Sequence, residues 1–308
     1  MKYYDIIIVG GGPAGLSAAV YASRAGRKVL VLEKQICGGQ IAFSSEVENY
    51  PGFINISGSE FASNLMEQAM RFGAEIEYDE VVNIGSYDNS ELYRFVLTGG
   101  MGEYCCNAVI IATGARSRSL NVPGEAEFKG RGVSYCAVCD GTFYRGRDVA
   151  VIGGGNTALE DAIYLSDICN KVYLIHRRNE FRGEPALSEQ IRVRNNIIPV
   201  YNSVLKSILG DDSLKISSVE ITNLQSDTDD TIDVSAVFIA AGRIPDTDLV
   251  SSVLKLDDSG YIISGEDCKT ETEGIFVAGD CRNRPVKQLA TAVCDGAVAA
   301  INAVEYLR

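Results

Sequence analysis

An apolar run, a glycine-rich turn and a helical pattern follow one another at the start of the chain. Residues 4–9 form an almost unbroken, largely β-branched run, which is typical of a buried parallel strand. The turn at 10–15 reads Gly-Gly-Gly-Pro-Ala-Gly, and residues 16–25 have the pattern of a helix. Residues 28–32 predict a second strand, closed by Glu33. This order predicts a βαβ unit.

The same order returns 143 residues further along the chain. Residues 148–152 form the apolar run, and Gly-Gly-Gly-Asn-Thr-Ala follows at 153–158. A helix over 158–165 and a strand over 171–175 complete the second unit. The chain therefore contains an internal repeat of two βαβ units, which predicts an α/β fold with parallel sheets.

The other patterned stretches predict elements that surround these units. They are an amphipathic helix over 57–72, strands within 75–112, returning strands within 202–241 with a polar hairpin near Asp211-Asp212, a strand over 274–280 and a helix over 290–307. We predict two domains, one built from 1–114 with 246–308 and the other from 115–245.

Composition narrows the class of protein. With 308 residues, 46% of them hydrophobic, the chain can bury two cores. A formal charge of −13 argues against a nucleic-acid partner. No apolar segment approaches the roughly 20 residues of a membrane helix. Nine cysteines, an odd number, suit a reducing compartment, so we expect a cytoplasmic protein.

The first glycine turn has the residues that a dinucleotide site needs. Gly10 permits a tight turn, Gly12 lets the backbone approach a pyrophosphate, and Gly15 lets helix and strand pack closely. The helix N-terminus offers N–H groups to the phosphates. Glu33 stands where a carboxylate accepts hydrogen bonds from ribose hydroxyls, so the site suits FAD or NAD. A purely structural glycine turn is the alternative.

In the second unit the position equivalent to Glu33 is occupied by His176, the only histidine. Arg177, Arg178 and Arg182 follow it, so a cationic cluster replaces the acid. Arginines bind a 2′-phosphate that a carboxylate would repel. The second site therefore suits NADP(H), although such a run in isolation would be a solvated surface.

Between the two units lies Cys136-Ala137-Val138-Cys139-Asp140. Two cysteines at this spacing can close a small disulfide or provide a reactive thiolate. Zinc binding would need two further ligands, and Cys105-Cys106 is only an adjacent pair, so we expect no metal. A leaving thiolate needs a proton, and Asp140 is the acid–base candidate unless it only forms an Asp-Gly turn.

The motifs GGGPAG, GGQI, VENYPG, CAVCDG, GGGNTALEDA, HRRNEFR and GIFVAGD occur in this order. Along nearly its whole length the chain resembles the low-molecular-weight thioredoxin reductase family. The resemblance implies two Rossmann-like dinucleotide-binding domains, an FAD domain with an inserted NADPH domain. It also implies tightly bound FAD, NADPH as hydride donor, thioredoxin as disulfide substrate, and a homodimer.

The resemblance and the residues that border its motifs give two sets of candidate cofactor contacts. The FAD candidates are Gly10, Gly12, Pro13, Ala14, Gly15, Glu33, Lys34, Gly39, Gln40, Ile41, Asn49, Ala112, Thr113, Gly114, Gly279, Asp280, Lys287, Gln288 and Leu289. The NADPH candidates are Gly153, Gly155, Asn156, Thr157, His176, Arg177, Arg178 and Arg182. Lys287-Gln288-Leu289 departs from the family's Arg-Gln-Ala.

The resemblance further implies that Cys139 faces the flavin and that Cys136 attacks thioredoxin. Cys139 lies only 14 positions before Gly153, so the dithiol and the nicotinamide belong to one domain and the flavin to the other. We therefore expect alternating domain orientations that pivot near Gly114-Ala115 and Gly242-Arg243.

Three other functions remain open. A flavin reductase that serves a peroxidase would carry extra N-terminal thioredoxin-like domains, and a ferredoxin-fed relative would not need the His176-Arg177-Arg178 cluster. A flavin-binding sensor without catalysis would not need the cysteine pair. Cys37, Cys281 and Cys294 have no family role, and we expect them to be core thiols.

Overall fold

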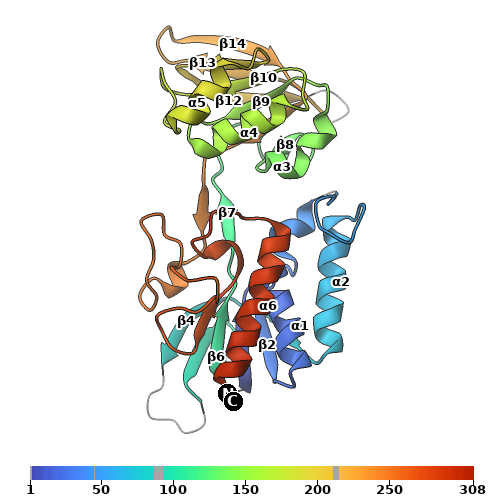
Figure 1. Cartoon of the computed structure of the whole chain (residues 1–308), viewed down its shortest axis with the longest axis vertical. Coiled ribbons are helices and arrows are strands. Elements are labelled where there is room, and N and C mark those ends of the chain that lie inside the picture. The colour runs from blue at the N-terminus through green and yellow to red at the C-terminus, as the bar shows by residue number, and fades with distance from the viewer. Residues whose placement is uncertain (1, 45, 87–92, 211–214) are drawn as a thin grey trace. The chain divides into compact units, whose positions relative to one another are not determined.

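The computed structural model describes residues 2–44, 46–86, 93–210 and 215–308, which form two compact units (Figure 1). The first unit consists of Met1–Arg116 with Ile244–Arg308, and the second of Ser117–Arg243. The connecting segments pair as β7 (Ala115–Ser117) and β16 (Arg243–Pro245). The hairpin predicted near Asp211-Asp212 lies outside the described residues.

The first unit is built on a seven-stranded sheet in the order β3-β2-β1-β6-β5-β4, with β17 paired to β6. Strands β1, β2, β3, β6 and β17 pair in parallel, and the β4–β5–β6 meander is antiparallel. The strands are β1 (Lys2–Val9), β2 (Val29–Glu33), β3 (Glu75–Tyr78), β4 (Val81–Ser86), β5 (Phe95–Gly99), β6 (Glu103–Ile111) and β17 (Ile275–Val277).

Helices α1 (Pro13–Arg24), α2 (Gly58–Arg71) and α6 (Leu289–Tyr306) belong to this unit, and α1 and α6 lie side by side (Figure 1). Their small residues allow a close approach, because a Cβ added at Gly296 would overlap the carbonyl oxygen of Ala14. The alanines of α1 and α6 pack on the branched residues of β1, β2 and β6. Short helical turns are η1 (Gly39–Phe43), η3 (Asp248–Val250) and η4 (Gly279–Cys281).

The second unit has a parallel five-stranded sheet in the order β11-β10-β9-β15-β8. One face packs on helices and the other on an antiparallel sheet, β12-β13-β14. The strands are β8 (Val133–Ser134), β9 (Val149–Ile152), β10 (Val172–Ile175), β11 (Ile197–Val200), β12 (Ser203–Gly210), β13 (Ile216–Asn223), β14 (Thr228–Asp233) and β15 (Ala236–Ile239). The helices are α3 (Ala137–Asp140), α4 (Asn156–Ser166), α5 (Pro185–Arg192) and the turn η2 (Gly141–Tyr144).

The repeat predicted from the sequence is therefore confirmed as β1-α1-β2 and β9-α4-β10. Both helices start earlier than predicted, at Pro13 and Asn156, directly after the glycines. Helix α5 was not predicted, because its eight residues are too few for a clear periodicity. Among the described residues, no helix is long and apolar enough to cross a membrane.

Candidate active site and cofactor sites

Cys136 and Cys139 form a disulfide, with 5.3 Å between their Cα atoms. Cys136 is the N-cap of the single-turn helix α3, and Cys139 lies within that turn. One helical turn brings residues i and i+3 to the same face, which places the two sulfur atoms within bonding reach. Both residues are half-buried. The pair is therefore a disulfide at the surface of the second unit.

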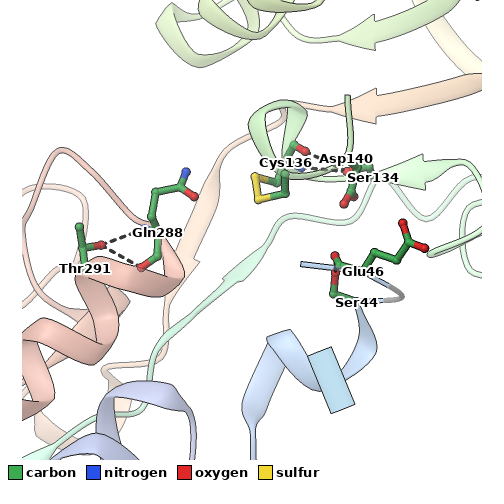
Figure 2. The surroundings of a disulfide bond; sticks show 8 residues. Ser44, Glu46, Ser134, Cys136, Asp140, Gln288 and Thr291 are labelled. Carbon is green, nitrogen blue, oxygen red and sulfur yellow. Dashed lines mark hydrogen bonds between the residues drawn. A yellow bond between two sulfur atoms is a disulfide. The ribbon is translucent and has the colours of Figure 1, made fainter. Parts of the chain in front are cut away.

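Asp140 is connected to Cys136 through Ser134, as Figure 2 shows. The Ser134 hydroxyl donates to Asp140 Oδ2 at 2.6 Å, and the Cys136 N–H donates to Ser134 Oγ at 3.1 Å. Burial raises the pKa of Asp140, and the hydrogen bond from Ser134 acts in the opposite direction. A carboxyl group with a raised pKa thus lies in the same hydrogen-bond network as the disulfide.

Tyr135, which lies between Ser134 and Cys136, also fixes the position of this segment. Its hydroxyl donates to Glu125 Oε1 at 2.7 Å, and that oxygen also accepts the Leu120 N–H at 3.1 Å. Sequence reasoning missed both Ser134 and Glu125. The alternation of Ser134 and Tyr135 along an extended segment sends their side chains to opposite sides, but it does not name their partners.

The first glycine turn has the geometry of a phosphate cradle. Gly10 has φ +108°, and an added Cβ would lie 2.8 Å from the carbonyl carbon of Ala112. A Cβ at Gly12, the N-cap of α1, would meet nothing within 4 Å. Open space therefore lies over the N-terminus of α1, where N–H groups and the helix dipole favour a phosphate. The turn fits a dinucleotide.

Other predicted FAD contacts gather at this turn. The Cα of Gly12 would lie 3.3 Å from a Cβ added at Gly39, and Ala14 Cβ would lie 2.8 Å from one added at Gly279. The segments that carry Gly39 and Gly279 thus converge on the start of α1 although they are far apart in the sequence. Asn49, by contrast, is exposed in a bend.

Glu33 lies at the end of β2, is buried, and already accepts two backbone hydrogen bonds. Gly11 N–H donates to Oε2 at 2.7 Å and Gln35 N–H donates to Oε1 at 2.8 Å. Each carboxylate oxygen has further acceptor capacity, so a ribose hydroxyl can still bind. Glu33 therefore shapes the turn itself, a role that its position in the sequence did not reveal.

Several predicted FAD contacts also have partners within the first unit. Lys34 Nζ forms an ion pair with Asp246 at 2.6 Å, and this hydrogen bond raises the pKa of Lys34. The Gln40 side chain donates to the carbonyl oxygen of Ala115. Lys287 Nζ donates to the carbonyl oxygens of Asp280 at 2.9 Å and Arg282 at 2.8 Å. These bonds hold the segments around the cradle in place.

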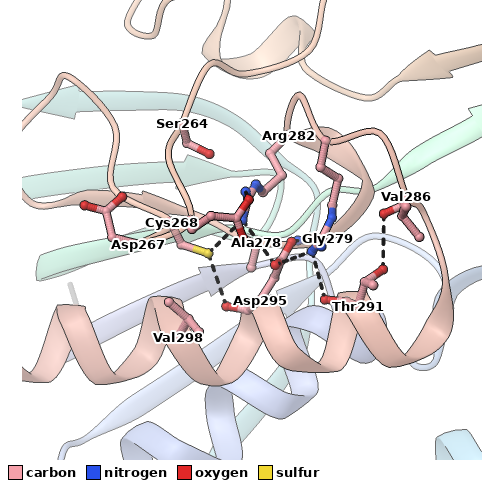
Figure 3. A network of polar contacts seen from close by, with 12 residues as sticks. Ser264, Asp267, Cys268, Ala278, Gly279, Arg282, Val286, Thr291, Asp295 and Val298 are labelled. Carbon is pink, nitrogen blue, oxygen red and sulfur yellow. Dashed lines mark hydrogen bonds and ion pairs between the residues drawn. The ribbon is translucent and has the colours of Figure 1, made fainter.

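A buried ionic network supports the Gly279–Asp280 turn (Figure 3). Asp295 of α6 is 3% exposed and Arg282 is 1% exposed. Asp295 Oδ1 pairs with Nη1 of Arg282 at 3.1 Å and also with Nη1 of Arg284. Its other oxygen, Oδ2, accepts the Gly279 N–H at 3.1 Å. In the sequence, this network is signalled by one acidic residue, Asp295, within an alanine-rich helix.

The second glycine turn repeats the open geometry at the start of α4. A Cβ added at Gly155, the N-cap, would meet nothing within 4 Å. The Asn156 side chain is engaged with Glu184, donating to Oε1 at 2.9 Å and accepting its N–H at 2.8 Å. The exposed Thr157 follows. This turn also fits a pyrophosphate.

His176 is buried, unlike the arginines that follow it in the predicted cationic cluster. The ring is 4% exposed, lies against Gly154, and has its centroid 5.8 Å from that of Phe181. Burial lowers the pKa of His176, and the nearby positive charge of Arg182 lowers it further. The lowered pKa favours the neutral imidazole, so the positive charge of this cluster comes from the arginines. Its Nε2 is buried without a hydrogen-bond partner among the described residues.

The three arginines after His176 are exposed. Within the described parts of the chain, none of Arg177, Arg178 and Arg182 forms an ion pair with a carboxylate. The Arg182 N–H donates to the Gly154 carbonyl at 2.7 Å, which folds this loop back onto the glycine turn. Unneutralised guanidinium groups beside a phosphate cradle fit a 2′-phosphate.

The remaining seven cysteines are free thiols. Cys37 and Cys281 are buried, as predicted, but Cys294 is exposed, so the prediction of a core thiol is wrong there. Cys294 lies on α6, where small residues occupy several faces and the pattern does not distinguish the inner from the outer side.

Comparisons with known proteins agree with this geometry. The family described as pyridine nucleotide-disulphide oxidoreductase matches residues 4–296. A thioredoxin reductase of Treponema pallidum is 43% identical over 99% of this chain and 97% of its own. The crystal structure of thioredoxin reductase from Streptococcus pyogenes gives a TM-score of 0.93 at 39% identity, covering 99% of this chain and 98% of that one. One from Giardia duodenalis gives 0.92 at 35% identity, covering 100% and 99%. The chain belongs to the pyridine nucleotide-disulphide oxidoreductase family, among its thioredoxin reductases.

Proposed function

We propose that this protein is an NADPH-dependent flavoenzyme that reduces the disulfide of thioredoxin through Cys136 and Cys139. The observation that carries the proposal is the Cys136–Cys139 disulfide joined through Ser134 to Asp140. This site lies in the unit that also carries the second glycine turn. We further propose that the enzyme is a cytoplasmic homodimer.

FAD is held by the first unit in this proposal. The cradle at Gly10–Gly15 and the N-terminus of α1 bind its pyrophosphate, Glu33 binds a ribose, and the Gly279–Asp280 turn binds further hydroxyls. When bound, FAD supplies the two-electron chemistry that connects NADPH to a disulfide. The chain's own contribution is to bind and orient it.

NADPH is held by the second unit. The open N-terminus of α4 at Gly155 binds the pyrophosphate, and Arg177, Arg178 and Arg182 bind the 2′-phosphate. His176, whose pKa is lowered by burial, contributes a buried ring that packs against the glycine turn at Gly154 rather than a charge. This assignment distinguishes NADPH from NADH by three exposed guanidinium groups.

The dithiol form of the site then reduces thioredoxin by exchange. The Cys136 thiolate attacks one sulfur of the partner disulfide, forming a mixed disulfide and releasing a partner thiolate. Asp140 gives this leaving group a proton. Cys139 then gives its thiol proton to the departing second partner sulfur and, as a thiolate, attacks Cys136 Sγ. This restores the Cys136–Cys139 disulfide and releases the second partner thiol. Two electrons and two protons have passed to thioredoxin.

Steady-state oxidation of NADPH and NADH, with and without thioredoxin, tests this function. We expect a yellow protein that oxidises NADPH only when thioredoxin disulfide is present, with NADH a poor donor. If no thioredoxin-dependent rate is seen, the substrate assignment is wrong. The alternatives are then a reductase that serves a peroxidase partner or a ferredoxin-fed relative. A colourless protein that does not bind added FAD would contradict every flavoenzyme assignment, including the sensor.

The arginines give a prediction about cofactor choice. In the double variant Arg177→Ala and Arg178→Ala, we expect the KM for NADPH to rise about 10- to 100-fold. A hydrogen bond to a charged group contributes roughly 1.5–3 kcal/mol, and solvent exposure of the arginines reduces that contribution. The KM for NADH should stay within about twofold. Arg192→Ala is the matched control, since Arg192 is an exposed arginine of the same unit that pairs with Glu189. An equal rise in both KM values would contradict the assignment.

Alternation between domain orientations is a second prediction. The disulfide and the NADPH turn lie in one unit and the FAD cradle in the other, and both the disulfide and the nicotinamide need access to one flavin ring. A photocleavable cross-link between cysteines placed one in each unit should lower turnover by about 100-fold or more, while one half-reaction remains. Cleavage by light should restore turnover. Normal turnover of the fully cross-linked protein would contradict the idea.

A further inference from the structure

Ser134 lies between the two groups that proton transfer at the dithiol requires. It is 6% exposed, at the end of β8, and its Oγ lies 2.6 Å from Asp140 Oδ2 and 3.1 Å from the Cys136 nitrogen (Figure 2). The same oxygen lies 3.3 Å from the carbonyl oxygen of Cys136. A serine hydroxyl has one hydrogen and two lone pairs, so it cannot donate to both oxygens at once.

When Asp140 is ionised, the hydroxyl donates to the carboxylate. Hydrogen bonds to a charged acceptor are the shorter and stronger ones, and 2.6 Å is a typical length for O–H···O⁻. The N–H of Cys136 occupies a lone pair of the same Oγ. In this state the serine hydrogen and one of its lone pairs are used, and the carboxylate charge is partly compensated.

When Asp140 is protonated, the direction of the bond can reverse. The carboxyl O–H donates to Ser134 Oγ, and the serine hydrogen rotates to the carbonyl oxygen of Cys136 at 3.3 Å. No heavy atom has to move, and no buried polar group loses its partner. A half-buried carboxyl group that gains and loses a proton in each cycle would otherwise leave an unsatisfied atom in one of the two states.

We propose that Ser134 is a positioning residue for this enzyme: its hydroxyl holds Asp140 beside the dithiol in both the ionised and the protonated state. This inference rests on the proposed function, in which protonated Asp140 gives its hydrogen to the partner thiolate and is reprotonated from solvent during turnover. Ser134 itself neither gains nor loses a proton. The bond from the Cys136 N–H to Ser134 also fixes the N-cap of α3.

Other titratable groups pack around α3, and a test must separate them. Tyr144 on η2 has its pKa raised by burial and then by the charge of Asp140, and Tyr164 on α4 contacts the same region at Gly141. Asp161 on α4 has a pKa raised to about 7 by burial and by Glu160, while Arg243 opposes this. Because Asp161 titrates near neutral pH, the measurements are made in an Asp161→Asn background as well.

The test is the pH profile of thioredoxin reduction by the holoenzyme with Ser134→Ala. Loss of the donor destabilises ionised Asp140 and so raises its pKa. We therefore expect the limb of the pH–rate profile that reports the ionisation of Asp140 to move up by about one pH unit. The maximal rate should fall about 10-fold. Ser134→Thr, which keeps the hydroxyl, should restore the limb. Ser203→Ala is the matched control, because Ser203 is also buried in the second unit and donates to a backbone carbonyl, that of Tyr201.

The outcomes are distinct. A purely structural role would lower the rate by one factor at every pH and leave the limb in place, which would overturn the proposal. Asp140→Asn should remove the limb, and its persistence would also overturn the proposal, even if Ser134→Ala does not fold. Infrared titration of the Asp140 carboxyl in isotope-labelled holoenzyme reads the shift without turnover. It therefore tests Ser134 even if thioredoxin is not the substrate.

Discussion

Replacing Cys139 by serine is expected to abolish thioredoxin reduction, by at least about 1,000-fold, because a serine hydroxyl neither ionises near neutral pH nor forms a disulfide. Cys136→Ser should have the same effect, since the two residues form a single disulfide. Both side chains are half-buried and serine is nearly isosteric, so the fold should persist. The measurements are thioredoxin-dependent NADPH oxidation and the flavin content of each variant.

Cys294→Ser is the control for this prediction, because Cys294 is exposed and free. It should keep full activity within about twofold. If Cys139→Ser retained a tenth or more of the wild-type rate, electrons would have to reach thioredoxin by a route other than this disulfide. A variant that lost its flavin along with its activity would point to a structural effect instead.

Asp295→Ala is expected to lower the free energy of unfolding of the first unit by about 3–5 kcal/mol, as is usual when a buried ion pair loses one partner. Arg282 would keep its charge at 1% exposure without the carboxylate that faces it. The Gly279 N–H would also lose its acceptor, so the turn that carries Asp280 should loosen. We therefore expect weaker retention of FAD, measured by flavin absorbance after gel filtration, together with a lower midpoint of guanidinium denaturation.

Glu266→Ala provides a matched control on the same arginine. Glu266 Oε1 lies 3.5 Å from Arg282 Nη2, but its side chain is 92% exposed. An exposed carboxylate at this distance is screened by water, so its loss should change the free energy of unfolding by less than about 0.5 kcal/mol, and FAD should be retained. Equal effects of the two substitutions would show that burial does not decide the strength of this network.

The comparison of Glu33 with His176 shows what a sequence pattern can predict about a side chain and what it cannot. Glu33 is the last residue of β2 and His176 directly follows β10, so the repeat correctly placed them at equivalent positions. Glu33 turns its oxygens to the N–H groups of Gly11 and Gln35, whereas the His176 ring packs against Gly154. The position was readable from the chain, but the direction of each side chain depended on the space around it.

The sequence by itself determined the two βαβ units, the glycine turn in each of them and the cysteine pair. These features depend on local spacing, because apolar periodicity and glycine turns act over a few residues. The tertiary structure alone decided the Ser134–Asp140 bond, the burial of His176 and the pairing of Asp295 with Arg282 and Arg284. Such contacts arise when separate segments pack and polar groups must find partners away from water, and that requirement leaves no local pattern in the chain.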